Sequence, residues 1–225
     1  MEDARPEDPA WINGFLPGLD AALLYGLLRR RQPARYVEIG SGNSTKFVAR
    51  ARRDGGLNTH LTSIDPMPRA EIDALCDEVI RAPLEGVDLG VLARLQPGDM
   101  LFFDGSHRVF MNADTVAFFL DVLPQLPPGV LVGVHDIRLP DDYPPEFAER
   151  WYSEQYLLAC WLLAESARVK PVFAAAFVSR HTSLGGLLDP LWNTPGFEAV
   201  ERHGDAFWFT TGQTWRERVR RRIRR

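Results

Sequence analysis

Near the start of the chain, two acidic residues each lie at or near the end of a short apolar run, and a glycine-containing turn follows the first run. Residues 36–45 read YVEIGSGNST, in which Glu38 precedes Gly40 and Gly42, and Asp65 follows a second apolar run, LTSI. Such a glycine-containing turn lets a ligand approach the backbone closely, and the N-terminus of the helix that follows attracts negative charge. This stretch therefore predicts a ligand site at the first turn from strand to helix.

A second group of polar residues follows two later apolar runs. MLFFDGSH (100–107) ends in Asp104 and, three residues on, His107, and GVLVGVHDI places His135 and Asp136 directly after its apolar part. If the two runs are neighbouring parallel strands, the two carboxylates converge at one edge of the sheet. Carboxylates that are brought together repel each other, and a divalent metal would relieve this repulsion.

Strand-like and helix-like patterns alternate through residue 136. The short apolar runs are nearly continuous, as in parallel strands that are buried on both faces between two layers of helices. The segments between them place apolar residues at helical spacing. This alternation predicts an α/β fold of the Rossmann-like, doubly wound type. Two further strands are expected late in the chain, at 170–179 and 205–211.

We expect one domain over residues 1–215. A helix is predicted at 15–31, and an aromatic helix at about 144–165 follows the fifth strand as a lid or cap, or alternatively as core or a dimer face. Residues 216–225 form a basic tail rich in arginine, which is either a solvated terminal helix or a contact for an anionic partner.

Composition narrows the functional classes. The 225 residues carry a net charge of -4, so the protein as a whole offers no cationic surface for nucleic acid. No apolar stretch approaches the roughly 20 residues that a membrane span needs. No signal peptide is recognisable, and the two cysteines lack a CxxC motif. We therefore expect a cytoplasmic protein without a membrane span. A homodimer is the assembly that we consider.

The glycine turn favours one cofactor over another. A dinucleotide fingerprint, GxGxxG, needs Gly or Ala where this chain has Thr45, so an NAD-dependent oxidoreductase is the less favoured alternative. S-adenosylmethionine carries a carboxylate, an ammonium and a sulfonium instead of phosphates. The helix N-terminus near Ser44 would receive the carboxylate, Glu38 would face the cationic part, and Asp65 would accept hydrogen bonds from the ribose hydroxyls.

These motifs together resemble a known family. EIGSGNST, Asp65, DGSH and HD are similar to the class I S-adenosylmethionine-dependent methyltransferases, in the branch of small-molecule O-methyltransferases, over about residues 15–180. The resemblance implies a seven-stranded, mostly parallel sheet with an antiparallel C-terminal hairpin. The cofactor-binding residues expected are Glu38, Gly40, Ser41, Gly42, Ser44, Asp65 and Asp104.

The second group of residues resembles metal-dependent O-methyltransferases of the catechol and macrolide-sugar types. That likeness implies a metal, Mg or Mn, on Asp104, His135 and Asp136, and it implies that His107 acts as general base. His135 departs from the pattern, because the family has an acidic residue there more often. An imidazole ligand shifts the preference from magnesium towards manganese, iron or zinc. Alternatively, His135 is a second base and no metal binds.

The predicted function is methyl transfer from S-adenosylmethionine to a hydroxyl group of a small molecule. A nucleic-acid methyltransferase is less favoured, because DGSH stands where a base-methylating enzyme would carry NPPY or DPPY. A binding protein that keeps the cofactor fold without catalysis remains a further alternative.

Overall fold

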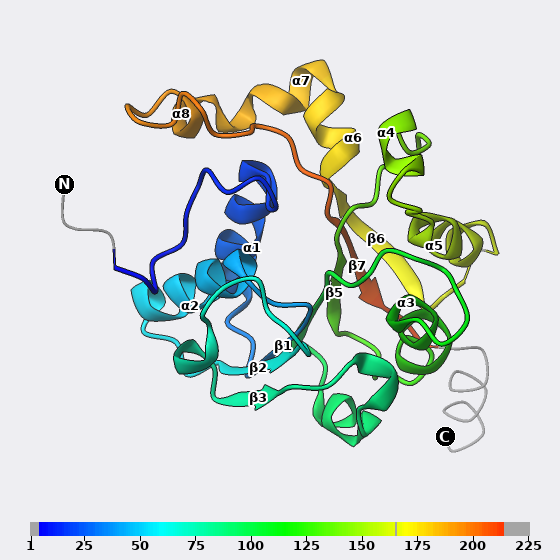
Figure 1. Cartoon of the computed structure of the whole chain (residues 1–225). Coiled ribbons are helices and arrows are strands. Elements are labelled where there is room, and N and C mark those ends of the chain that lie inside the picture. Colours follow the sequence, from blue (N-terminus) through cyan, green and yellow to red (C-terminus); the bar gives the residue numbers. More distant parts are fainter. Residues whose placement is uncertain (1–4, 165, 214–225) are drawn as a thin grey trace, which may run out of the picture.

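A seven-stranded sheet forms the centre of the protein (Figure 1). The computed structural model describes residues 5–164 and 166–213, so the predicted basic tail lies outside the described residues. The strand order is β3-β2-β1-β4-β5-β7-β6; the first five strands run parallel, and β7 runs antiparallel to β5 and β6. This confirms the predicted Rossmann-like sheet and its antiparallel C-terminal pair. The strands are β1 (Arg35–Ile39), β2 (His60–Ile64), β3 (Glu78–Ile80), β4 (Met100–Phe103), β5 (Leu131–Val134), β6 (Val169–Ala174) and β7 (Phe207–Thr211).

Helices cover both faces of the sheet. Successive residues of a strand point to opposite faces, so each central strand packs against both layers of helices. Tyr36 and Phe102 pack with helices α1 (Gly18–Arg31) and α2 (Asn43–Gly55). Their neighbours Val37 and Phe103 pack on the other face with α3 (Asp114–Ala117), with the π-helical turn Phe118–Val122 that continues it, and with α5 (Glu154–Leu163). Both faces of the central strands are thus buried, as their continuous apolar runs predict.

The strand order reverses at β1, which lies between β2 and β4. Ligands of open α/β sheets bind at the carboxyl ends of the strands near such a point. Here the chain leaves β1 through Gly40, which has a φ of +80° and donates a backbone hydrogen bond to Ile64 (3.0 Å). A Cβ atom on Gly40 would overlap the carbonyl oxygen of Asp104, so this turn requires glycine.

Two predicted helices have different bounds in the structure. The first begins at Gly18 rather than at residue 15. The aromatic helix predicted at 144–165 is divided into α4 (Pro145–Ala148) and α5. The division occurs where Trp151 takes a φ of +61° and the backbone N–H of Ser153 donates to the carbonyl of His107 (2.8 Å). Docking on the loop after β4 therefore overrides the helical pattern.

The first of the two late strands is shorter than predicted. β6 ends at Ala174, opposite the first residue of β7, and the chain continues as helix α6 (Ala175–Arg180). The remaining short helices are α7 (Thr182–Gly185), α8 (Asp189–Trp192) and the 3-10 turns Asp73–Leu75, Leu84–Gly86, Leu89–Arg94 and Gly186–Leu188. No helix in the described part of the chain is long and apolar enough to cross a membrane.

Replacing Gly40 tests the close approach of β1 and β4. We expect Gly40→Ala to lower the free energy of unfolding by about 3 kcal/mol or more, because it adds a steric overlap to an unfavourable φ. The matched control is Gly26→Ala, at an exposed helical position with open space around its Cβ. This control should be neutral or stabilising by up to about 1 kcal/mol. Denaturant unfolding of both variants is the measurement, and equal effects would contradict the argument.

Candidate functional site

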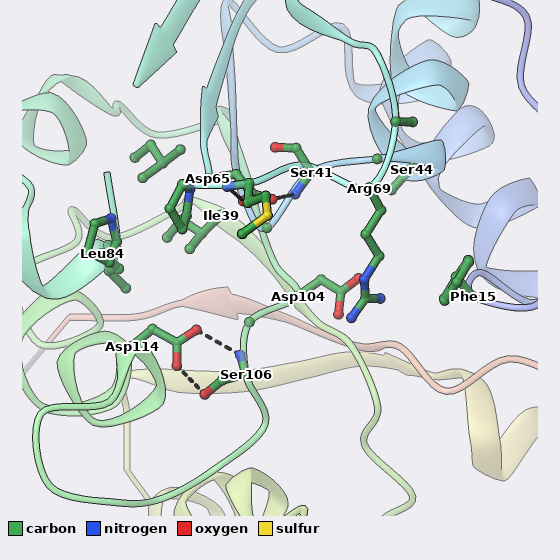
Figure 2. A pocket seen from close by; sticks show the side chains of 18 of the residues that line it. Phe15, Ile39, Ser41, Ser44, Asp65, Arg69, Leu84, Asp104, Ser106 and Asp114 are labelled. Carbon is green, nitrogen blue, oxygen red and sulfur yellow. Dashed lines mark hydrogen bonds between the residues drawn. The ribbon is translucent and has the colours of Figure 1, made fainter. Parts of the chain in front are cut away.

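A cavity of about 620 Å³ opens at the carboxyl ends of the strands (Figure 2). This is within the usual range for small-molecule sites. It extends from the loop after β1 to the loop after β4. Six of the seven residues predicted to bind the cofactor line it: Gly40, Ser41, Gly42, Ser44, Asp65 and Asp104.

Glu38, the seventh predicted residue, lies beneath the glycine loop and does not line this cavity. Its Oε2 accepts a hydrogen bond from the hydroxyl of Thr45 (2.5 Å), and that hydroxyl oxygen accepts one from the backbone N–H of Gly42 (3.1 Å). Burial raises the pKa of Glu38 to about 7, although the hydroxyls of Ser44 and Thr45 oppose the rise. Glu38 and Thr45 therefore fix the loop from below.

Asp65 lies at the rim of the cavity, beside the glycine loop. Its Oδ2 accepts a hydrogen bond from the backbone N–H of Ser41 (2.6 Å), and its Oδ1 accepts one from Met67 (2.7 Å). The Ser41 hydroxyl is in turn hydrogen-bonded to that of Ser63 (2.8 Å). These contacts hold the carboxylate in one orientation, and each of its oxygens keeps a further lone pair for a ligand.

The opposite end of the cavity is formed by the loop after β4. Asp114, at the start of α3, closes this loop, since its carboxylate accepts hydrogen bonds from the backbone N–H (2.7 Å) and the hydroxyl (2.5 Å) of Ser106 (Figure 2). The sequence interpretation did not identify Asp114. Asp114 belongs to none of the motifs found in the sequence, so its spacing gave no signal.

Behind Asp104 the structure brings together four predicted residues, Asp104, His107, His135 and Asp136, which we call the charge cluster. Nε2 of His107 lies 3.3 Å from Oδ1 of Asp104 and 3.2 Å from Oδ2 of Asp136. Nδ1 of His135 lies 3.6 Å from each of the same two oxygens. One ring nitrogen of each histidine therefore faces the pair of carboxylates.

The other nitrogen of each histidine faces a buried acid that sequence reasoning missed. Nδ1 of His107 is hydrogen-bonded to Oε1 of Glu154 (2.5 Å), at the start of α5. Nε2 of His135 lies 3.3 Å from Oδ2 of Asp20 in α1. We call Asp20 and Glu154 the backing carboxylates. Both side chains are fully buried. In the sequence the only signal was an acidic residue within a mostly apolar helical stretch, and this does not identify the histidine that the acid contacts.

The charges of the cluster stabilise one another. Burial alone would raise the pKa of Asp104, but His135 and His107 hold it well below its ordinary value. Burial opposes a charge on His107, yet Glu154 and Asp104 raise its pKa well above the usual range. The pKa of His135 is likewise raised against the effect of burial, by Asp136 and Asp104. Neighbouring opposite charges thus outweigh desolvation throughout the cluster.

The donor atoms of the cluster fit a divalent metal. One ligand atom each from Asp104, His107 and Asp136 lie within 4.8 Å of one another. The side chains of Asp104 and Asp136 are 21% and 17% exposed, so solvent reaches them, whereas His107 is buried. His107 and Asp136 also have left-handed backbone conformations, with φ of +62° and +54°. Residues held in such conformations are concentrated at functional sites.

The predicted aromatic cap covers the charge cluster and does not line the cavity described above. The ring of Tyr152 lies 4.4 Å from that of His107, centroid to centroid, and the hydroxyl of Tyr143 donates to the backbone carbonyl of Asp136 (3.0 Å). Trp151 is 75% exposed. The segment between α4 and α5 therefore shields His107 from solvent.

Comparisons with known proteins agree with this fold. Residues 37–137 match a family described as a methyltransferase domain. An O-methyltransferase from Bacillus cereus in complex with S-adenosylhomocysteine is 16% identical, with a TM-score of 0.51 over 90% of this chain and 84% of that one. A protein from Klebsiella pneumoniae, provisionally assigned as an O-methyltransferase, is 15% identical, with a TM-score of 0.52 over 88% and 84%. The search of curated proteins gave no match. The predicted resemblance to class I S-adenosylmethionine-dependent methyltransferases is confirmed.

Glu38→Gln tests the cost of the buried acid. The folded state binds a proton more tightly than the unfolded state, so Glu38 lowers stability progressively as pH rises from about 4.5 to about 7. Between pH 4 and a pH above that range, the free energy of unfolding of the variant should therefore rise by about 3 kcal/mol relative to that of the unmodified protein. Denaturant unfolding at pH 4 and pH 8 measures this. A difference that does not change with pH would contradict the assignment.

Proposed function

We propose that this chain, which has the class I methyltransferase fold, transfers a methyl group from S-adenosylmethionine to a hydroxyl oxygen of a small molecule. One observation carries this proposal. The glycine loop and Asp65 form one end of the cavity, and Asp104, which belongs to the charge cluster, lies at the other end. Cofactor and acceptor contacts are thereby adjacent. Methyl transfer from a sulfonium is an in-line displacement, and it depends mainly on such positioning.

The cofactor contacts follow from the chemistry of the lining residues. Backbone N–H groups at the start of α2, near Ser44, would hold the carboxylate. Asp65 would accept hydrogen bonds from the ribose hydroxyls through its remaining lone pairs. Asp104 lines the cavity, and its pKa is held below its ordinary value, so we assign to it the attraction of the cationic part. Glu38 is then a positioning residue for the loop.

Acceptor activation is assigned to the open side of the charge cluster. Asp104, Asp136 and His107 would hold a divalent metal, which when bound lowers the pKa of a hydroxyl in contact with it. In this proposal the partly exposed carboxylates of Asp104 and Asp136 orient the acceptor towards the cavity. The buried backing carboxylate Glu154 keeps the ring of His107 in place.

The second candidate role of His107 is that of general base. Its imidazole is close to both carboxylates, but its side chain is only 4% exposed. A base must come within hydrogen-bonding distance of the acceptor hydroxyl. The enclosed position of His107 favours the role of ligand.

Binding of S-adenosylhomocysteine tests the cofactor assignment. We expect the unmodified chain to bind it in calorimetric titration and to show no binding of NADH. Asp65→Ala should weaken binding about 10- to 100-fold, since it removes a hydrogen-bonded anion from the rim of the cavity. Asp121→Ala, at an exposed position outside the cavity, is the matched control and should bind normally. NADH binding without S-adenosylhomocysteine binding would overturn the proposal.

His107→Ala separates the two roles of this histidine. As a ligand, its loss should lower the affinity for Mn²⁺ at least about tenfold while S-adenosylhomocysteine binding persists, because it removes one of the three side chains that would hold the ion. Titration of the metal-stripped variant, followed by electron paramagnetic resonance, is the measurement. Unchanged Mn²⁺ affinity together with lost methyl transfer would instead support the general base.

A further inference from the structure

Arg69 is the one cationic side chain among the described residues that line the cavity. It belongs to the loop after β2, and Figure 2 shows its side chain extending from that loop into the cavity. We propose that Arg69, held by the ring of Phe15, binds a carboxylate of the methyl acceptor, so that the acceptor is an anionic hydroxy compound. This inference rests on the proposed function and concerns the chemical class of its substrate.

No acid in the described part of the chain neutralises Arg69. Its guanidinium forms no ion pair with the carboxylates that line the same cavity, which are those of Asp65, Glu85, Asp104 and Asp114. The backbone N–H of Arg69 donates to the carbonyl of Ser41 (3.3 Å) and so fixes the residue beside the glycine loop. The N–H groups of its guanidinium are therefore available to a ligand.

The ring of Phe15 holds the guanidinium in place without using these donors. The guanidinium carbon lies 5.0 Å from the centroid of the ring, which is a cation–π contact. Phe15 is 61% exposed, so the hydrophobic core does not fix it. Its backbone is held by Asn13 instead, whose Oδ1 accepts hydrogen bonds from the N–H groups of Phe15 (2.9 Å) and Leu16 (2.8 Å).

The loop that carries Phe15 is anchored on α2. Oδ1 of Asn43 accepts a hydrogen bond from the backbone N–H of Ala10 (2.9 Å), and Nδ2 of Asn43 donates to the carbonyl of Ala10 (2.8 Å). The ring of Trp11 packs against that of Phe47, with 4.8 Å between the centroids. These contacts preform the wall of the cavity against which Arg69 rests, so little ordering is needed when an anion binds.

The charge of the cofactor indicates that the anion comes from the acceptor. S-adenosylmethionine carries an ammonium and a sulfonium but only one carboxylate, so an arginine in its cavity opposes its binding. Its carboxylate already has a place, because the first N–H groups of α2, those of Asn43 and Ser44, have no partner within the helix. An anionic acceptor would compensate the charge of Arg69.

Matched probes test the charge of the acceptor. Para-hydroxybenzoate and para-hydroxybenzamide have nearly the same shape and differ in charge, as do β-hydroxybutyrate and its amide. With S-adenosylhomocysteine bound, the unmodified chain should bind the acid of at least one pair about tenfold more tightly than the amide in calorimetric titration, because hydrogen bonds from arginine to a carboxylate are charge-assisted. Equal binding within both pairs, or no measurable binding of either acid at millimolar concentration, would overturn the inference.

Variants then assign the preference to Arg69. Arg69→Gln should abolish it, and Arg69→Lys should restore only part of it, because an ammonium lacks the planar fork of the guanidinium. Phe15→Leu should weaken binding of the acid about two- to fivefold, since the cation–π contact is lost. Arg30→Gln, at an exposed position of α1 outside the cavity, is the matched control and should bind all probes normally.

Arg69 and Phe15 are both exposed, so these variants should fold, and circular dichroism checks this. A preference for the acid that persists in Arg69→Gln would contradict the inference.

Cofactor affinity distinguishes the two possible sources of the anion. Arg69→Gln should bind S-adenosylhomocysteine as tightly as the unmodified chain. A loss of about tenfold or more for S-adenosylhomocysteine but not for methylthioadenosine, which lacks the carboxylate, would place Arg69 at the cofactor and overturn the assignment to the acceptor. An equal loss for both nucleosides would show a structural role and would also overturn it.

The same titrations separate this inference from the proposed function. If the unmodified chain binds S-adenosylhomocysteine but does not prefer the acids, the inference fails and the methyltransferase proposal stands. If the chain binds no S-adenosylhomocysteine, the proposed function fails, and the acids and amides are compared on the ligand-free chain. A preference that is lost in Arg69→Gln would then retain Arg69 as an anion-binding residue, and its absence would remove that role.

Discussion

Burial of several carboxylates in one place is the constraint that governs this structure. A carboxylate removed from water needs an opposite charge or hydrogen-bond donors, because the protein interior screens its charge poorly. Here the two histidines of the charge cluster provide those partners, and backbone N–H groups at the start of β7 support Asp20. The arrangement requires α1, β4, β5 and α5 to meet at one edge of the sheet. The carboxyl ends of parallel strands offer such a meeting point.

Much of the site could be predicted because its residues follow directly after strands. An apolar run identifies a strand, and parallel pairing then places the residue after each strand at the same edge, whatever the intervening loops do. Asp65, Asp104 and Asp136 were located in this way. Glu38, two positions before Gly40, is still inside β1, and its buried carboxylate contacts Thr45 and does not line the cavity. Its expected contact with the cofactor stays a prediction.

The backing carboxylates could not be located from the sequence, because their partners are distant along the chain. Asp20 is separated from His135 by more than half of the protein, and no local spacing links them. Glu154 became a neighbour of His107 only because the predicted helix is interrupted before Ser153. That interruption arises from tertiary hydrogen bonds between Ser153 and the loop after β4, which outweigh a local preference for helix.

The segment that matches the methyltransferase-domain model, residues 37–137, includes the whole charge cluster but neither backing carboxylate. The histidines of the charge cluster therefore lie inside the matched segment, while the carboxylates behind them come from parts of the chain outside it. Divergence in those outer parts can change the environment of both histidines without altering any residue of the matched segment. Two proteins with identical motifs can therefore differ in the charges that surround those histidines, and a classification based on the motif alone would treat them as equivalent.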